Sequence, residues 1–323
     1  MTSMDSDLRD FILRRVVQIP VVLFLVSVIV FYIIHLPEGG PEALLSGQAG
    51  DEAIREFRDR YNLNEPLYVQ YLLWIQGILT GSLGTSITTN QPVASLIASR
   101  LPVTLMLGFF SVAISVMIAV PAGYISAVEQ YTWKDHTATV LAFVGLSIPN
   151  FFLAILLIKL FSVELGWLPI TASGQMFSDW SLTLKSMVLP SLALGTALAA
   201  HVTRILRSSM LDIYSEEYVH VARAKGLPEK MVNRSIVFKN ALIPVITIVM
   251  LQMGYVLGAT VIIEEVFAMP GLGRLMLNSV VGRDYPVMQA VVLLYATAYL
   301  VFNLIADVAY GLVDPRIKYG GEH

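Results

Sequence analysis

The chain has 323 residues, 56% of them hydrophobic and only 14% charged, with a mean hydropathy of +0.69. A soluble domain carries roughly a quarter charged residues, so these values exclude most soluble folds, and they predict an all-α polytopic membrane protein. The formal net charge of −3 gives no general attraction to nucleic acid, and the absence of cysteine excludes disulfides, thiolate metal sites and cysteine nucleophiles.

Six windows are long and apolar enough to be transmembrane helices, each of which needs about 20 mostly apolar residues. They are Val16–Leu36, Leu101–Ala127, Thr137–Leu165, Ser186–Leu206, Leu242–Phe267 and Val287–Val313. The first window lacks a small-residue cleavage site, which indicates a retained anchor rather than a signal peptide. The windows divide the chain into a start and first span (1–36), an outer segment (37–100), a five-span core (101–313) and a tail (314–323).

The positive residues near the spans predict the orientation, because such residues tend to stay in the cytoplasm. They lie before the first span (Arg9, Arg14, Arg15), between the fourth and fifth (Arg204, Arg207, Arg223, Lys225, Lys230, Arg234, Lys239) and after the last (Arg316, Lys318). With six spans these three segments lie on one side. We therefore expect both termini in the cytoplasm and residues 37–100 outside.

The outer segment contains two stretches with helical periodicity. Glu52–Asn62 is charged with apolar residues at helical spacing, and Leu67–Leu79 carries an apolar stripe. Both are predicted to be amphipathic helices. Two interpretations remain open: the helices pack on the outer ends of the spans, or they form a docking surface for an external partner.

A cytoplasmic insert at about 207–241 separates the fourth and fifth spans. Glu216 and Glu217 suit a helix start, Gly226 supplies a stop, and Pro228 is predicted at the first position of a second helix. The recurring positions of the first helix are Tyr218, Val221, Ala222 and Lys225, and the predicted buried positions of the second are Met231, Ile236 and Phe238. The insert is either a solvated basic loop that enforces topology or an element that docks a partner.

Polar and small residues within the spans suggest local features. Pro149 predicts a kink in the third span, with Asn150 beside it to satisfy a freed backbone group. Gly254 and Gly258 form a GxxxG pattern, which permits close helix contact but is common by chance.

A polar group near the end of the last span is costly to expose to lipid. It consists of Asn303, Asp307, Tyr310 and Asp314. We interpret it as a structural hydrogen-bond cluster, with a proton relay as the alternative. An intramembrane enzyme using Asp307 and Asp314 is disfavoured, because a spacing of seven residues separates them by about 10 Å along a helix.

Several catalytic motifs do not occur in the sequence. There is no GxxxxGK[ST] string, so the chain cannot supply its own Walker nucleotide site. HExxH and GxSxG are also missing, as is any ion-selectivity filter motif that would favour a passive channel. Any ATP hydrolysis must come from a partner.

The cytoplasmic insert resembles the EAA loop of importer permeases of the ATP-binding cassette (ABC) superfamily. At the Glu-Ala-Ala positions this chain has His220, Val221 and Ala222, followed after three residues by Gly226. The expected Leu-Pro appears as Ile243-Pro244. These departures are typical of the peptide-permease branch, whose usual sequence at this place is similar to VARAKGL followed by KNALIPVIT in this chain.

The resemblance extends over nearly the whole chain to the first of the two paired permeases of dipeptide and oligopeptide transporters. The similar strings include ILRRVVQIPVVLFLVSVIVFYIIHLPEGGP, EPLYVQYLLWIQGILTGSLGTSI, RLPVTL, LSIPNFF, LGWLPITASG, PGLGRL, RDYPVMQ and NLIADVAYGLVDPRI. One departure is Pro228, where relatives commonly have a capping serine.

The resemblance implies a type I ABC importer permease fold in the cell membrane and a transport subunit that is not an enzyme. The implied partners are a second homologous permease, two ATPases that bind ATP and Mg, and an external binding protein, with no nucleic acid. The cargo it implies is di- or oligopeptide, with nickel chelates, glutathione or oligosaccharides as alternatives.

The same resemblance implies functional residues, and no metal or cofactor bound by this chain. The implied ATPase-coupling residues are Glu217, Tyr218, Val221, Ala222, Arg223, Ala224, Lys225, Gly226, Pro228 and Glu229. The candidates for lining a translocation pathway or packing beside it are Asn150, Gln252, Asn303 and Asp307.

Overall fold

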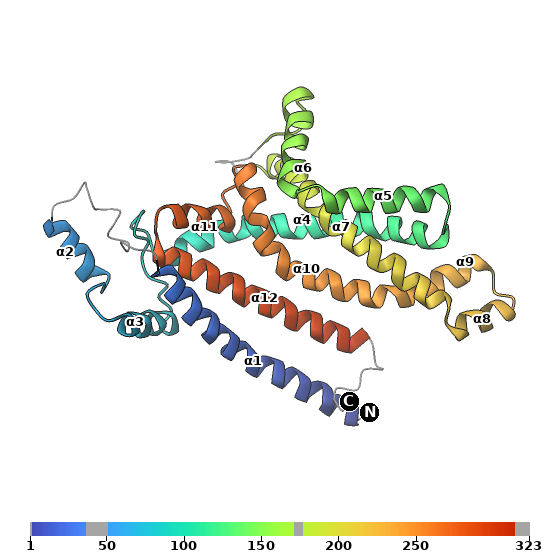
Figure 1. Cartoon of the computed structure of the whole chain (residues 1–323), viewed down its shortest axis with the longest axis horizontal. Coiled ribbons are helices and arrows are strands. Elements are labelled where there is room, and N and C mark those ends of the chain that lie inside the picture. The colour runs from blue at the N-terminus through green and yellow to red at the C-terminus, as the bar shows by residue number, and fades with distance from the viewer. Residues whose placement is uncertain (1, 37–50, 171–176, 314–323) are drawn as a thin grey trace.

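Helices make up most of the chain in the computed structural model, which describes residues 2–36, 51–170 and 177–313 (Figure 1). The elements are α1 (Thr2–Ile34), α2 (Asp51–Arg60), α3 (Leu67–Leu79), α4 (Val93–Val128), α5 (Trp133–Ser147), α6 (Asn150–Leu157), the π-helix η2 (Ile158–Glu164), α7 (Trp180–Tyr214), α8 (Glu217–Ala224), α9 (Glu229–Met231), the π-helix η3 (Val232–Val237), α10 (Phe238–Val266), α11 (Leu272–Val281) and α12 (Tyr285–Val313). No strand occurs in the described ranges, only a bridge between Thr85 and Pro92.

Five helices are long and apolar enough to cross a membrane, and a bent pair supplies a sixth span. They are Leu13–Ile33, Val93–Val128, Trp180–Tyr214, Glu229–Val266 and Tyr285–Ala309, and the pair is Trp133–Gly145 with Asn150–Glu164. Each overlaps one of the six predicted windows. Several helices extend beyond their windows, since α4 begins at Val93, before Leu101, and α7 begins at Trp180, before Ser186.

The third span is broken rather than kinked. Its two halves meet at 101°, and Ile148 and Pro149 are extended between them, with ψ of 121° and 135°. A proline disfavours the helical conformation of the preceding residue and removes a backbone donor, which explains why the break falls here. Asn150 begins α6, and its side chain makes no hydrogen bond within the described residues, so its predicted backbone bond is absent.

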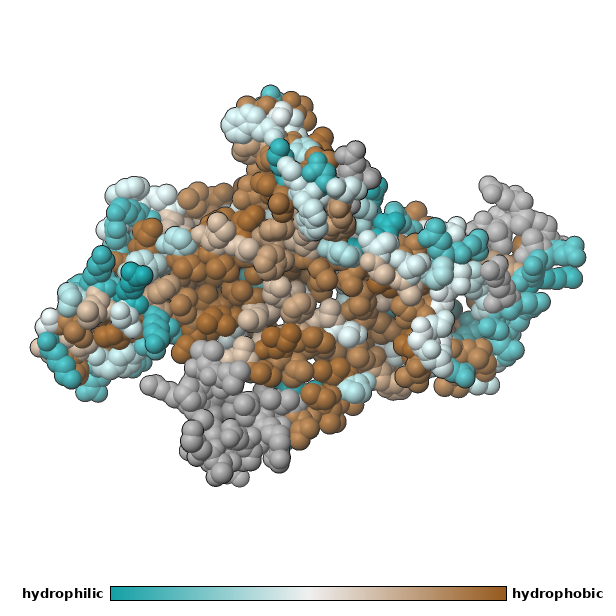
Figure 2. All heavy atoms as spheres, turned by 180° about the vertical axis from the view of Figure 1, so that it is seen from behind, coloured by the Kyte–Doolittle hydropathy of each residue, from teal (hydrophilic) through white to brown (hydrophobic). Residues whose placement is uncertain are grey.

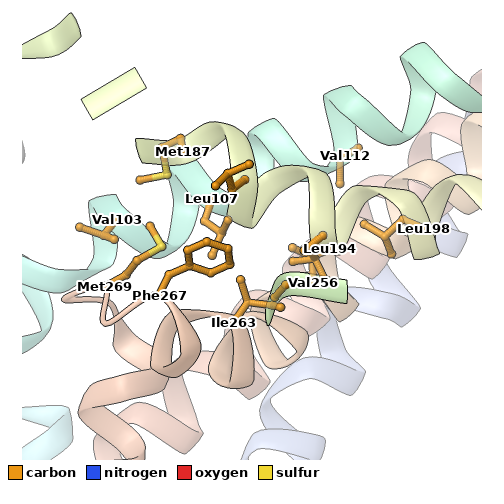
Figure 3. Packing of buried hydrophobic residues seen from close by; sticks show 13 residues of the cluster. Val103, Leu107, Val112, Met187, Leu194, Leu198, Val256, Ile263, Phe267 and Met269 are labelled. Carbon is orange, nitrogen blue, oxygen red and sulfur yellow. The ribbon is translucent and has the colours of Figure 1, made fainter. Parts of the chain in front are cut away.

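The core lies between α4, α7 and α10, where apolar side chains interdigitate (Figure 3). Leu107 of α4, Leu194 of α7 and Ile263 of α10 are each at most 1% exposed. Gly195 permits this close approach, because a Cβ there would lie 2.7 Å from the carbonyl oxygen of Ser111. Helices in lipid associate through such van der Waals packing at small residues.

The two glycines of the GxxxG pattern on α10 have different neighbours. A Cβ at Gly254 would lie 3.2 Å from Tyr299 Cδ2 of α12, whereas one at Gly258 would meet nothing within 4 Å. The first glycine therefore allows α10 to approach α12. The second faces away from the described part of the chain.

The ends of the molecule are polar and its middle is apolar. Figure 1 shows α2, α3 and α11 at one end of the long axis and α8 and α9 at the other. Figure 2 shows a broad hydrophobic surface between two more hydrophilic ends. Exposed side chains such as Phe109 (59%) and Met117 (73%) on α4 belong to this band. The arrangement is that of a bundle whose middle is surrounded by lipid or by other membrane subunits.

The two helices predicted in the outer segment are present as α2 and α3, but α3 is apolar around most of its surface, and Leu79 of its predicted apolar stripe is 82% exposed. Helix α3 packs on α1, where Tyr71 lies 5.4 Å from Phe31 between ring centroids and its hydroxyl lies 2.9 Å from Ser27 Oγ. Its other face leaves Tyr68 and Leu72 at least 60% exposed. Packing on a span is thus shown, while the docking surface stays a prediction.

A buried carboxylate ties the loop after α3 to the start of α12. Asp284 is 1% exposed and accepts hydrogen bonds from Ser86 Oγ at 2.5 Å and Thr88 Oγ1 at 2.8 Å. The backbone N–H groups of Ile87 and Thr88 also donate to it, at 3.1 and 3.3 Å. Four donors satisfy the carboxylate, as burial of a charged group requires.

A second buried carboxylate holds α11, a helix that the sequence analysis did not predict. Glu264 is 0% exposed and accepts from Thr104 Oγ1 at 2.7 Å and from the backbone N–H of Arg274 at 3.1 Å. The N-terminus of a helix favours an anion. Gly271 and Gly273 are required here, because a Cβ on either would come within 3.0 Å of the Glu264 carboxylate.

Asp307, in the polar cluster predicted near the end of the last span, has a partner that the sequence analysis did not name. Asp307 Oδ2 lies 3.1 Å from Arg15 Nε of α1, so the charge is balanced by a cation from another helix. Asn303 Oδ1 is buried without a hydrogen-bond partner. Asp314 lies outside the described residues, as does the side chain of Tyr310.

Candidate coupling site

Helix α8 forms the exposed tip of the polar end opposite α2 and α3 (Figure 1). It begins at Glu217, whose carboxylate suits a helix N-terminus. It ends because Gly226 adopts a φ of +76°, in the left-handed region where glycine is unstrained, and its N–H donates to the carbonyl of Arg223 at 2.9 Å. The predicted short helix with a glycine stop is therefore confirmed.

The two faces of α8 separate the predicted coupling residues. Val219 (0% exposed) and Ala222 (6%) are buried, and Val219 belongs to an apolar cluster with Leu206 and Met210 of α7. Tyr218 (41%) and Val221 (46%) lie on the exposed face. Also exposed are Glu217, Ala224, Lys225, Gly226, Pro228 and Glu229.

An open hollow of about 660 Å³ lies beside the exposed face of α8. It is lined by Glu216, Glu217, Tyr218, Val221, Ala222, Lys225 and Leu227. An aromatic ring, an aliphatic side chain and both signs of charge meet here. Such a mixture is typical of the surface of a protein interface rather than of a catalytic site.

Arg223 fixes the orientation of α8. Its Nε lies 2.8 Å from Glu229 Oε1, and its guanidinium carbon lies 5.5 Å from the centroid of the Tyr214 ring. The Tyr214 hydroxyl in turn donates to Asn233 Oδ1 at 2.8 Å. These contacts join α8 to the end of α7 and to η3.

The second helix of the insert differs from the prediction. Pro228 precedes the helix as its cap, with ψ of 140°, rather than occupying its first position. Met231 is 49% exposed, whereas Val232 and Val237 are fully buried. Val232 and Val237 belong to the π-helix η3, which follows Met231 and continues into α10.

An ion pair that the sequence analysis missed lies under the same end of the bundle. Asp135 of α5, with a side chain 4% exposed, accepts hydrogen bonds from Arg207 Nε and Nη2 of α7, both at 3.0 Å. Ser126 of α4 and the backbone N–H of Tyr131 also donate to the carboxylate. The pair therefore ties together three helices. The sequence showed Arg207 only as one basic residue among several.

The candidate pathway residues lie on α6, α10 and α12, and none of them is on α8. Gln252 is 7% exposed, and its Nε2 donates to the carbonyl of Leu198 at 3.2 Å, while its Oε1 is buried without a partner. Asn150 begins α6 and Asn303 lies within α12. Their role in a pathway stays a prediction.

Replacing Arg223 with alanine is expected to reduce transport far more than stability. Glu229 is 61% exposed, so the ion pair itself contributes at most about 1 kcal/mol. Without the Arg223 side chain, α8 is no longer held against Glu229 and Tyr214, and this should lower substrate uptake per ATP hydrolysed by the reconstituted complex. The control is Arg234→Ala, which removes an exposed charge in η3. Equal uptake by the two variants would contradict a positioning role for Arg223.

Two family models match the chain. The model described as binding-protein-dependent transport system inner membrane component matches residues 119–319. Its companion, the N-terminal part of the same class of membrane component, matches residues 8–108.

Curated relatives match almost from end to end. The glutathione transport system permease proteins GsiC of Escherichia coli K12 and Shigella dysenteriae serotype 1 are each 40% identical over 311 residues, which cover 96% of this chain and 99% of the relative. A similar structure is the inward-facing MetNI methionine ABC transporter, with a TM-score of 0.57 and 18% identity over 68% of this chain and 97% of that one. An amino acid ABC transporter matches with a TM-score of 0.50 and 20% identity, over 69% and 95% of the two chains.

Proposed function

The chain belongs to the family of binding-protein-dependent transport system inner membrane components, and from this membership we propose that it carries small peptides such as glutathione. It is a permease subunit of an ABC importer with the type I permease fold, and not an enzyme. An ATPase and a binding protein are its partners. We propose that the complete complex contains a second homologous permease, two ATPases and one external binding protein.

The exposed face of α8 is the observation that carries the coupling role. Tyr218 and Val221 are large apolar side chains left open to solvent on a helix that ends the bundle. Exposed apolar groups beside charges favour contact with another protein. We assign this face to the ATPase, which places α8 and both termini in the cytoplasm. ATP and Mg bind on the ATPases, and this chain needs no cofactor of its own.

The mechanism follows from the connections of α8. When two ATPases close on ATP, the α8 helices of the paired permeases approach each other. Arg223 and the buried Val219 transmit this displacement to α7 and η3, and η3 continues directly into α10. A tilt of these spans opens the pathway alternately to the two sides of the membrane. Asn150, Gln252 and Asn303 are proposed to line this pathway, with Asp307 packing beside it.

We place the external binding protein at the end of the molecule opposite α8. Helices α2 and α3 lie there, and α3 exposes Tyr68 and Leu72. We propose that the binding protein rests on this surface and releases its peptide into the pathway. Nickel chelates and oligosaccharides are the less favoured cargoes, because the relatives found here are named as glutathione permeases. Mass spectrometry of the ligand that co-purifies with the binding protein identifies the cargo.

The substitution Val221→Asp tests the coupling role. A carboxylate in the middle of the exposed apolar face should weaken binding of the ATPase by at least tenfold, about 1.4 kcal/mol of interface energy, and lower ATP-driven uptake in proteoliposomes accordingly. The matched control is Met231→Asp, which places the same charge at an apolar residue 49% exposed but outside the hollow. Normal uptake by Val221→Asp, in a complex that retains its ATPases, would refute the assignment.

A further inference from the structure

A pocket separate from the coupling site lies between α4, α5 and α7. Its volume is about 360 Å³. The lining residues are Ser126, Thr139, Ala142, Phe143, Ala200, Thr203, Arg204, Arg207, Ser208, Leu211 and Asp212. The turn that joins α4 to α5 lies at the same end of the molecule as α8 (Figure 1), so the pocket is at the end of the spans that we place in the cytoplasm.

Apart from the Arg207–Asp135 ion pair, the pocket has one positive and one negative side chain that are available to a ligand. Arg207 is neutralised by Asp135, with two hydrogen bonds at 3.0 Å. Two exposed charges remain on α7, Arg204 and Asp212, and neither forms an ion pair with a described residue. Eight residues separate them, or about 12 Å along the helix, with the hydroxyl of Ser208 between. The cation lies deeper in the span and the carboxylate nearer its end.

The apolar wall of the pocket continues onto a surface that lipid can cover. Phe143 lines the pocket and is 57% exposed, and Val140, Leu141 and Val144 of the same helix are 45% to 64% exposed. Ala142, Ala200 and Leu211 complete the wall. A ligand held by the polar groups would therefore have an apolar surface directly beside it, along α5.

We propose that this pocket binds a zwitterionic phospholipid of the phosphatidylethanolamine type. The phosphate is held by Arg204 with the hydroxyl of Ser208, the primary ammonium donates to Asp212, and the acyl chains lie along the apolar face of α5. Basic pockets between transmembrane helices at the cytoplasmic side bind the phosphates of anionic lipid headgroups. Here Asp212 adds an acceptor for an ammonium beside the arginine. Phosphatidylglycerol has no ammonium for Asp212, and the quaternary group of phosphatidylcholine has no N–H to donate, so the pocket discriminates among the three headgroups.

The test uses native mass spectrometry of the delipidated importer complex titrated with each lipid. We expect phosphatidylethanolamine to bind about tenfold more tightly than phosphatidylcholine, because a charge-assisted hydrogen bond is lost. Arg204→Gln should weaken all three lipids by a similar factor. Asp212→Asn should remove the preference for phosphatidylethanolamine and strengthen the binding of phosphatidylglycerol. The control is Arg234→Gln, in η3 and outside the pocket.

Other outcomes overturn the proposal. Equal binding of the three lipids by the unmodified complex contradicts it, as does unchanged binding in Arg204→Gln. Should that variant fail to assemble, Arg204→Lys keeps the charge and must retain the preference for phosphatidylethanolamine. Competition by inorganic phosphate alone would reassign the pocket to a soluble anion. Competition by glutathione would reassign it to a transported peptide, which also carries an ammonium and a carboxylate.

Discussion

Replacing Arg207 with alanine is expected to lower the free energy of unfolding by about 3 kcal/mol or more. The change leaves the Asp135 carboxylate, whose side chain is 4% exposed, without the cation that donates two hydrogen bonds to it. Removal of one partner from a buried ion pair leaves an uncompensated charge and costs about 3–5 kcal/mol. The measurement is the temperature at which the purified complex loses its monodisperse form, together with the amount of complex recovered from membranes.

A double substitution separates the ion pair from simple loss of packing. Arg207→Leu with Asp135→Leu removes both charges and keeps apolar volume, so we expect it to be closer to the unmodified protein than Arg207→Ala is. Arg234→Ala, an exposed arginine in η3, is the control and should change stability by less than about 0.5 kcal/mol. If the double variant is the least stable of the three, the buried charge is not the cause of the loss.

Replacing Gly271 with alanine is expected to cost about 3 kcal/mol, because the new methyl group has no space. Its Cβ would lie 2.3 Å from Glu264 Oε2. The carboxylate cannot move aside freely, since Thr104 Oγ1 and the N–H of Arg274 hold it at 2.7 and 3.1 Å. We expect the N-terminus of α11 to separate from α10, with a fall in thermal stability and faster proteolysis at α11.

Gly258 provides the matched control for this prediction. It lies on α10 as Glu264 does, and a Cβ there meets nothing within 4 Å. Because alanine is the better helix former, Gly258→Ala should leave the stability of the chain equal or raise it by up to about 1 kcal/mol. Similar losses from the two alanines would show that close contact with Glu264 does not explain the requirement for Gly271.

The sequence predicted those features that depend on neighbouring residues. Six apolar windows correspond to six spans when the bent pair is counted as one, and the short helix before Gly226 is present. Each depends on periodicity or on one residue with special backbone preferences. The break at Pro149 could be placed for the same reason, although its angle of 101° could not, because the angle depends on packing.

The sequence could not reveal features that join distant residues. Asp135 and Arg207 are 72 positions apart, and Arg15 and Asp307 are 292 apart. No local pattern distinguishes an arginine that pairs from one that faces solvent. Met231 was misassigned as buried: it ends the short helix α9, and the buried positions begin with Val232. For α11, the two glycines of PGLGRL were a usable signal, since glycine beside a helix start indicates close backbone approach.

The carboxylate of Asp284 has a consequence for biosynthesis. Its donor Ser86 precedes it by 198 residues, so at a synthesis rate of about 5–20 residues per second the loop after α3 waits roughly 10–40 s for its acceptor. During that interval the loop has only its internal hydrogen bonds, such as that of Thr89 Oγ1 to Ser86 Oγ at 2.8 Å, and the carboxylate acceptor is missing. The loop can gain this acceptor only after Asp284, the residue before α12, has been synthesised. A chain that ends before Asp284 therefore lacks the four hydrogen bonds that tie this loop to the start of α12.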